Sequence, residues 1–151
     1  ARVGVIDVQR LVLESQRGRV ILDQLKNLRE QKAAEGEERQ QEIQRLQGRL
    51  QDAGSTLSED SLAELEKDLE EKIIEFRRFA DDAERVLEKE QEDAFARIER
   101  EVMPIIDRVG REQGFTLLFN KYESGLVFAA DEVDITGLIL ELYDQSVEGE
   151  N

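Results

Sequence analysis

The sequence Gly54-Ser55-Thr56-Leu57-Ser58 separates two long segments in which apolar residues recur every three or four positions. That spacing is typical of helices that pack against a neighbour along one stripe. Gly54 suits the position just after a helix, and Ser58 is a good N-cap for the next helix. The sequence therefore predicts two antiparallel helices joined by a turn at residues 54–58.

Two glycine or proline positions inside these helices are candidate hinges. Gly36 lies in the first helix, where glycine is less favourable than alanine by up to about 1 kcal/mol. Pro104 lies in the second helix and removes the hydrogen bond to the Arg100 carbonyl, so a kink is expected there. The second helix is expected to end at Gly114, which supplies a C-cap.

Short apolar segments at the two ends of the chain predict a small separate part. Residues 3–8 are rich in β-branched side chains and predict a strand, and residues 115–120 and 126–129 predict two further strands joined as a hairpin. Residues 8–14 predict one or two helical turns, interrupted at Ser15 and Gly18.

The end of the chain predicts a short helix over residues 137–145, capped by Asp134 or Thr136. Together these elements indicate an α+β fold. A small β-rich body would consist of residues 1–14 and 105–151, and a long antiparallel helical hairpin of residues 15–104 would be inserted into it.

Composition argues against several classes of function. The 151 residues carry a formal charge of −15, which repels nucleic acids and anionic lipid surfaces, so neither is expected as a strong partner. Histidine and cysteine are both absent, which removes the usual proton shuttle, soft-metal ligands and thiol nucleophile. The sequence shows no paired carboxylates placed for acid–base chemistry, no phosphate-binding loop and no calcium loop. We therefore expect no enzymatic activity, no cofactor and no metal.

Several short motifs occur along the chain in a characteristic order. The opening Val3-Gly4-Val5-Ile6-Asp7-Val8-Gln9-Arg10 is followed by Glu14-Ser15 and Gly18, then by the charged hairpin with Leu57-Ser58-Glu59 at its turn. The chain closes with Gly114-Phe115, Leu117-Leu118 and Val133-Asp134-Ile135-Thr136. In this order and spacing the motifs resemble the Skp family of periplasmic chaperones, also called OmpH-like, over nearly the whole chain.

The resemblance implies a homotrimer with a β-rich body and three helical arms around a cavity. It also implies an ATP-independent holdase for unfolded outer-membrane β-barrel proteins, located in the periplasm after removal of a signal peptide. The chain starts at Ala1, which suits a processed export product or a trimmed chain equally well. The best-studied relatives are strongly basic, whereas this chain is strongly acidic.

The apolar stripe of the hairpin has a gap in the first helix, where Lys32, Glu35, Gly36 and Arg39 replace apolar residues. Antiparallel pairing about the turn places this gap opposite Ile73, Phe76 and Ala80. Two interpretations remain open. The Lys32 and Arg39 stems cover Phe76, or the gap is a client-binding or hinge site. The residues expected to bind clients are Ile73, Phe76, Phe79 and Val86.

The strands of one chain are too few to cover both faces and edges of a sheet, so the body is expected to trimerise. The residues expected at the trimer interface are Val3, Val5, Ile6, Leu117, Phe119, Val127 and Phe128. The alternative to a holdase is a coiled-coil scaffold or spacer whose arms bind one defined partner helix. An unbroken heptad seam would favour the scaffold, whereas this seam has a gap.

Overall fold

The computed structural model describes residues 1–150 and divides into two compact units. The first, which we call the body unit, consists of Ala1–Gln24 and Gln91–Asn151; the second, the arm unit, is Leu25–Glu90. Two long helices, α2 (Gln16–Ala53) and α3 (Glu59–Glu112), run through both units. Asn151 lies outside the described residues.

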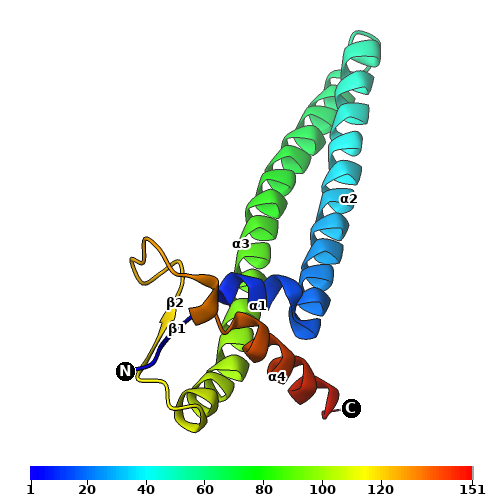
Figure 1. Ribbon diagram of the computed structural model, residues 1–151. Helices are drawn as coiled ribbons and strands as arrows, with labels where there is room; N and C mark the ends of the chain where they lie inside the picture. The colour runs from blue at the N-terminus through cyan, green and yellow to red at the C-terminus, as the bar shows by residue number, and fades with distance from the viewer. Residues whose placement is uncertain (151) are drawn as a thin grey trace. The chain divides into compact units, whose positions relative to one another are not determined.

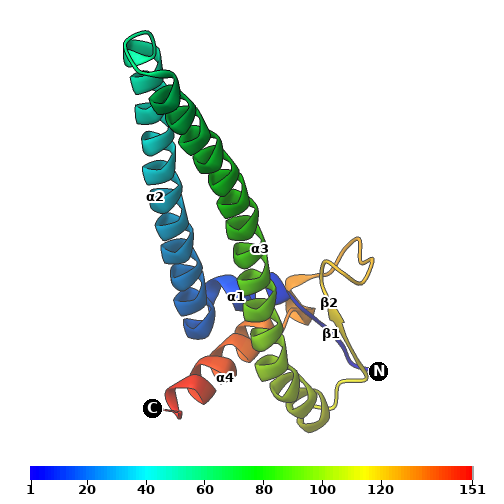
Figure 2. The same cartoon turned by 180° about the vertical axis from the view of Figure 1, so that it is seen from behind.

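The arm unit is an antiparallel hairpin of the outer parts of α2 and α3, which lie side by side in Figures 1 and 2. The Ser58 side chain accepts a hydrogen bond from Ser61 N at 3.2 Å, which confirms Ser58 as the N-cap of α3. Gly54 does not adopt the left-handed conformation expected of a residue at the C′ position. Glycine is needed there because a Cβ would lie 2.4 Å from the Leu50 carbonyl oxygen.

The hairpin seam is best packed toward its turn. Ile43, Leu46 and Leu65 are buried between the two helices, with 9%, 5% and 7% of their surface exposed. Lys72 on α3 reaches Glu42 on α2, with 3.8 Å between Nζ and Oε1. Together, burial and this ion pair fix the register of the two helices.

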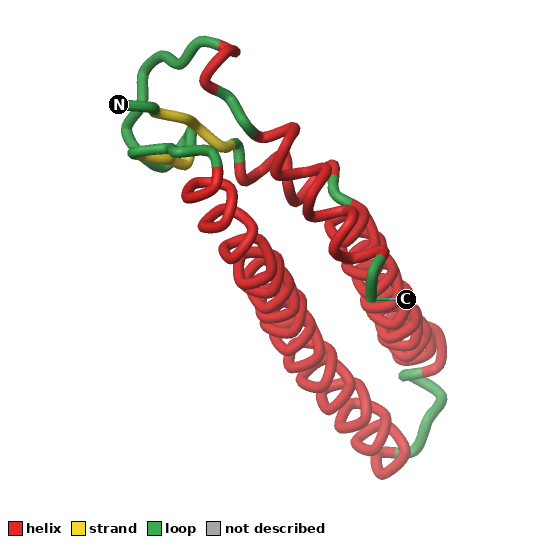
Figure 3. Tube along the Cα trace, turned by 60° about the horizontal axis from the view of Figure 1, so that its bottom comes forward, coloured by secondary structure: helices red, strands yellow, loops and turns green. Residues whose placement is uncertain are grey.

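The body unit holds a parallel pair of short strands, β1 (Val3–Ile6) and β2 (Leu117–Asn120), shown as the adjacent yellow segments in Figure 3. Val3 pairs with Leu117 and Val5 with Phe119. The other edge of β1 is occupied near Asp134, because Ile135 N donates to the Val5 carbonyl at 3.0 Å. The strand predicted over residues 3–8 is therefore confirmed over Val3–Ile6, and the one predicted over residues 115–120 is confirmed over Leu117–Asn120.

The hairpin predicted between residues 115–120 and 126–129 is wrong. After β2 the chain leaves the sheet in a loop on the side away from α4 (Figure 2), and residues 126–129 form no strand. Val127 and Phe128 are 101% and 82% exposed, so they pack against nothing in this chain. A third strand here would have no layer behind it, and an unsupported hairpin is marginally stable in water.

Three helical segments complete the body unit: α1 (Val8–Glu14), the 3-10 helix η1 (Asp131–Val133) and α4 (Thr136–Glu148). The α4 helix is longer than predicted and includes residues 146–148. Asp134 accepts from Thr136 N at 2.9 Å, and Thr136 Oγ1 accepts from Asp7 N at 2.8 Å. These bonds join the start of α4 to the end of β1. The α+β class is confirmed, with a body that is more helical than expected.

The core of the body unit is formed by one apolar face from each of α1, α3 and α4. Leu11, Ile98, Ile139 and Tyr143 are each at most 1% exposed. The α3 helix continues through Pro104 and ends at Glu112, and the φ of 71° at Gly114 confirms the predicted C-cap. Residues near Pro104 on this face, Val102 and Ile105, are buried as well.

The junction of α1 and α2 depends on close backbone approach. Ser15 ends α1 in an extended conformation, and its hydroxyl accepts a hydrogen bond from Gly18 N at 3.0 Å. A Cβ on Gly18 would lie 1.7 Å from the Val12 carbonyl oxygen. Backbone atoms cannot move aside as a flexible side chain can, so only glycine fits at this position.

Substituting Gly18→Ala is therefore expected to lower the free energy of unfolding by at least about 1–3 kcal/mol, because α1 must shift away from α2. Gly48→Ala, in the same helix, is the matched control, since a Cβ there meets nothing within 4 Å. The control should be neutral or stabilising by up to about 1 kcal/mol. Urea denaturation followed by circular dichroism measures both, and equal effects of the two substitutions would refute the packing argument.

Candidate functional site

The candidate client-binding surface lies in the arm unit, on the face of α3 that meets α2. Ile73, Phe76 and Phe79 are half-buried there, and Val86 is 40% exposed. None of these four side chains is covered to the degree of Ile43, Leu46 or Leu65 nearer the turn. The stripe thus keeps apolar surface in contact with solvent.

Gly36 on α2 lies directly opposite these aromatic rings. A Cβ on Gly36 would lie 3.4 Å from Phe79 Cε1 and 4.0 Å from Phe76 Cε2. The expected register is correct at this level, since the glycine of the gap faces Phe76. Because Gly36 has no side chain, it makes neither of the contacts that a Cβ would make with these two rings.

Two cationic side chains of α2 lie over the ring of Phe79. The Arg39 guanidinium carbon lies 4.7 Å from the centroid of the Phe79 ring, and Lys32 Nζ lies 5.9 Å from the same centroid. Arg39 is held by Glu35, with 3.1 Å between the paired atoms. Both cations thus lie over Phe79, one turn from Phe76 along α3, and the covering of Phe76 by these stems stays a prediction.

The residues expected at the trimer interface divide into exposed and buried groups. Val3, Leu117, Val127 and Phe128 are 40%, 53%, 101% and 82% exposed. Phe119 is half-buried, and Val5 and Ile6 are 3% exposed, because they pack inside the body unit. Any contact with a second chain therefore has to use the exposed group.

The body unit also contains an open apolar groove of about 810 Å³. Its walls come from α1, from the body part of α3 and from β2. The exposed apolar residues that line it are Leu13, Phe95, Met103 and Tyr122. Exposed apolar surface is thus present in both units.

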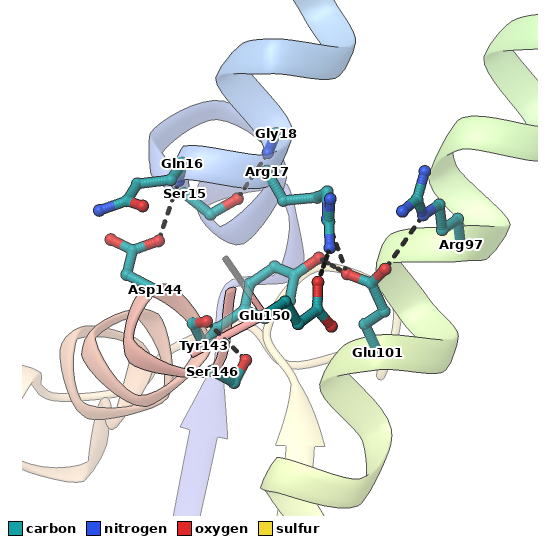
Figure 4. A network of polar contacts seen from close by, with 10 residues as sticks. All are labelled: Ser15, Gln16, Arg17, Gly18, Arg97, Glu101, Tyr143, Asp144, Ser146 and Glu150. Atoms are coloured by element: carbon teal, nitrogen blue, oxygen red, sulfur yellow. Dashed lines mark hydrogen bonds and ion pairs between the residues drawn. The ribbon is translucent and has the colours of Figure 1, made fainter. Parts of the chain in front are cut away.

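A polar network that the sequence did not reveal joins α2, α3 and α4 within the body unit (Figure 4). Glu101 is its centre: one carboxylate oxygen accepts from Tyr143 Oη at 2.6 Å and from Arg17 Nε at 3.1 Å. The other oxygen accepts from Arg97 Nε at 3.0 Å. Arg17 also donates to Glu150 at 2.6 Å. Charged residues are so common in this chain that no spacing signal singled out the five residues of this network.

A second set of bonds ties α4 to the start of α2, and Figure 4 shows the one between Gln16 and Asp144. The Asp144 carboxylate accepts from Gln16 N at 2.9 Å, so a side chain from α4 caps α2. Gln16 Nε2 donates to Glu148 at 2.7 Å. These contacts join residues more than 120 positions apart, which local sequence patterns do not reveal.

The network changes the proton affinities of its members. Desolvation alone would raise the pKa of Glu101, but hydrogen bonds from Tyr143, Arg97 and Arg17 outweigh it and hold that pKa below its ordinary value of 4.5. Burial, followed by the hydrogen bond to Glu101, raises the pKa of Tyr143. The cluster is therefore an ionised carboxylate bound by a neutral phenol and two cations, which is an arrangement that joins helices.

The acidic loop over residues 131–134 serves the fold. One oxygen of Asp134 accepts from Thr136, and the other lies 3.5 Å from Lys121 Nζ. Asp131 and Glu132 are exposed. Within residues 1–150, no helix combines the length and apolarity that a bilayer crossing requires.

The lowered pKa of Glu101 predicts an acid-sensitive fold. Its stabilising contribution is fully present above the unfolded value, near pH 4.5, and is lost as the pH falls through the lower folded pKa. Glu101→Gln should lower the free energy of unfolding at pH 7 by about 1–3 kcal/mol and flatten its fall below pH 4.5. The control is Glu99→Gln, an exposed carboxylate on the same helix.

Urea denaturation at a fixed protein concentration, repeated from pH 3 to pH 7, measures this dependence. The same fall in stability below about pH 4.5 in wild-type protein and Glu101→Gln would contradict the assignment.

Two comparisons place this chain among known proteins. A family model described as outer membrane protein (OmpH-like) matches residues 2–143. The fold is similar to the crystal structure of a candidate outer membrane chaperone (OmpH-like) from Caulobacter crescentus CB15, with a TM-score of 0.86 and 21% sequence identity. That similarity covers 95% of this chain and 84% of the other. No curated protein matches the sequence. Because the family model spans nearly the whole chain, this protein belongs to the OmpH-like outer membrane protein family.

Proposed function

We propose that this chain is an ATP-independent holdase chaperone of the periplasm. It binds unfolded outer-membrane β-barrel proteins in a cavity between the arms of a homotrimer and prevents their aggregation. Membership of the OmpH-like family supports this proposal, as does a fold shared with a protein described as an outer membrane chaperone.

One observation in the structure supports the proposal most directly. Val86 is 40% exposed in the arm unit, and Phe76 and Phe79 are half-buried opposite Gly36, which has no side chain to cover their rings. Apolar surface gains about 25 cal/mol for each Å² removed from water, so a client segment that covers these side chains is held by burial alone. The interrupted seam favours this role over a scaffold that binds one defined helix, which would use a continuous stripe.

Binding of this kind needs no ATP hydrolysis. Burial of client apolar surface drives capture, and folding of the client removes the surface that the arms hold. Gly36 adds flexibility to α2 at the same level, so the arms can adjust to clients of different size, and Pro104 is the second proposed hinge.

The trimer is proposed to form through the body, residues 1–14 and 105–151. Val127 and Phe128, with Val3 and Leu117, supply apolar surface that packs against nothing in one chain. Three chains of −15 carry −45, which keeps nucleic acids and anionic membranes away and leaves apolar contact or basic client segments as the source of attraction.

The trimer is tested by a mass measurement in solution. We expect about 52 kDa, three times 17.4 kDa, at micromolar protein concentration. Val127→Ser with Phe128→Ser should shift the mass toward 17.4 kDa, because serine side chains gain little free energy from burial between chains. Val20→Ser, at another exposed apolar position of the body unit, should leave the trimer intact. A folded monomer of wild-type protein would exclude the trimer and its cavity.

The client site is tested with an unfolded β-barrel protein diluted from urea in the absence of ATP. Phe76→Ser with Phe79→Ser should weaken suppression of light scattering, while mass and helix content stay unchanged. Ile74→Ser is the matched control, since Ile74 is 41% exposed on the same helix. Gly36→Ala, whose Cβ fits at ordinary contact distance, should stiffen the arm and narrow the range of client sizes. Full activity of the double serine variant would show that Phe76 and Phe79 do not bind clients and only pack between the helices.

A further inference from the structure

We propose that the arm unit recognises aromatic side chains of its clients through a niche in which Arg39 and Lys32 supply cation–π contacts. This inference rests on the holdase function proposed above and names the class of client residue that the arms select. The niche is defined by Phe79, Ala83 and Val86 as an apolar floor and by Lys32, Arg39 and Arg78 as cations at its rim.

The niche has room for a side chain. It is open to solvent and encloses about 370 Å³ between α2 and α3, at the level where Gly36 leaves α2 without a side chain. Val86 is 40% exposed on its floor, and Phe79 is half-buried. An incoming apolar group therefore contacts apolar atoms on one side and cations on the other.

The cations are already arranged to bind a ring. The Arg39 guanidinium stacks 4.7 Å from the Phe79 centroid, and Glu35 holds it there by an ion pair of 3.1 Å. The Arg39 side chain is still 38% exposed, so part of it remains accessible to a second ring. An arginine between two aromatic rings binds both through the negative faces of their π-systems.

One nitrogen of Arg39 has no hydrogen-bond partner among the described residues in this arrangement. Among residues 1–150, Arg39 Nε is buried without a hydrogen-bond partner. Leaving a buried donor unpaired is unfavourable, which lowers the barrier to a small shift of Arg39 when a client ring enters. The niche is thus preformed, with one side chain able to adjust.

Charge favours a neutral ring over a charged group. The arm unit carries 12 lysine and arginine residues against 19 aspartate and glutamate residues, a net charge of −7. Around the niche, three carboxylates, Glu35, Glu75 and Asp82, balance the three cations. The niche is therefore neutral within an acidic arm, and an aromatic ring enters it without bringing an unpaired charge out of water.

The clients of the proposed function carry such rings in quantity. Transmembrane β-barrels have girdles of aromatic residues at both membrane interfaces, so an unfolded barrel chain presents many of them. A niche that binds one aromatic side chain in each arm would then engage clients of unrelated sequence. This explains how selection by residue type coexists with breadth in client sequence.

The test uses the full chain and two fluorescently labelled peptides of the same length and charge. One carries phenylalanine at four positions, and the other carries cyclohexylalanine, which has a similar size and apolarity but no π-system. We expect the wild-type protein to bind the phenylalanine peptide about 2- to 30-fold more tightly by fluorescence anisotropy.

Lys32→Gln with Arg39→Gln should abolish this preference while the cyclohexylalanine peptide binds as before. Lys26→Gln with Arg45→Gln removes two exposed cations of the same helix and should keep the preference. Equal binding of the two peptides to wild-type protein, or a preference that survives loss of Lys32 and Arg39, overturns the inference alone. Failure to bind either peptide, together with failure to suppress aggregation, overturns both the inference and the holdase function.

Discussion

In an antiparallel pair of helices, each helix can bury only one stripe of apolar side chains against the other. The structure of this protein depends on how completely that stripe is filled. In the arm unit the stripe is used fully near the turn, where Ile43, Leu46 and Leu65 leave water. At Gly36 the stripe has no side chain on α2, and Phe76 and Phe79 opposite it are half-buried. A hairpin with a complete seam would be more stable but would offer a client nothing to cover. The gap therefore links the stability of the arm to its proposed function.

The body unit has few apolar residues with which to hold the ends of α2 and α3 and the short helix α4 together. Glu101 does so by accepting hydrogen bonds from α2, α3 and α4 through Arg17, Arg97 and Tyr143. Because these partners are charged or buried, each bond is stronger than a neutral surface contact. The helices of the body unit are joined by polar bonds as well as by the apolar core around Leu11 and Ile139.

Sequence alone predicted the elements that are set by neighbouring residues. The turn at 54–58, the N-cap Ser58, the break at Ser15 and the C-cap Gly114 all depend on local chemistry, and the structure confirms them. Prediction failed where distant segments decide. Residues 126–129 have strand composition but no layer to pack against in one chain, and the stacking of Arg39 on Phe79 depends on side-chain positions across the seam that spacing does not resolve. The Glu101 network spans the chain and carries no local signal.

We propose that clients bind where the seam between α2 and α3 is incomplete. Amide hydrogen exchange of the assembled protein, measured with and without an unfolded β-barrel client, tests it directly because exchange reports local opening along each helix. We predict that client binding slows exchange most around residues 32–39 of α2 and 73–86 of α3, and much less near Ile43 and Leu65, which are already buried. Protection confined to the turn, or to the body alone, would contradict the claim.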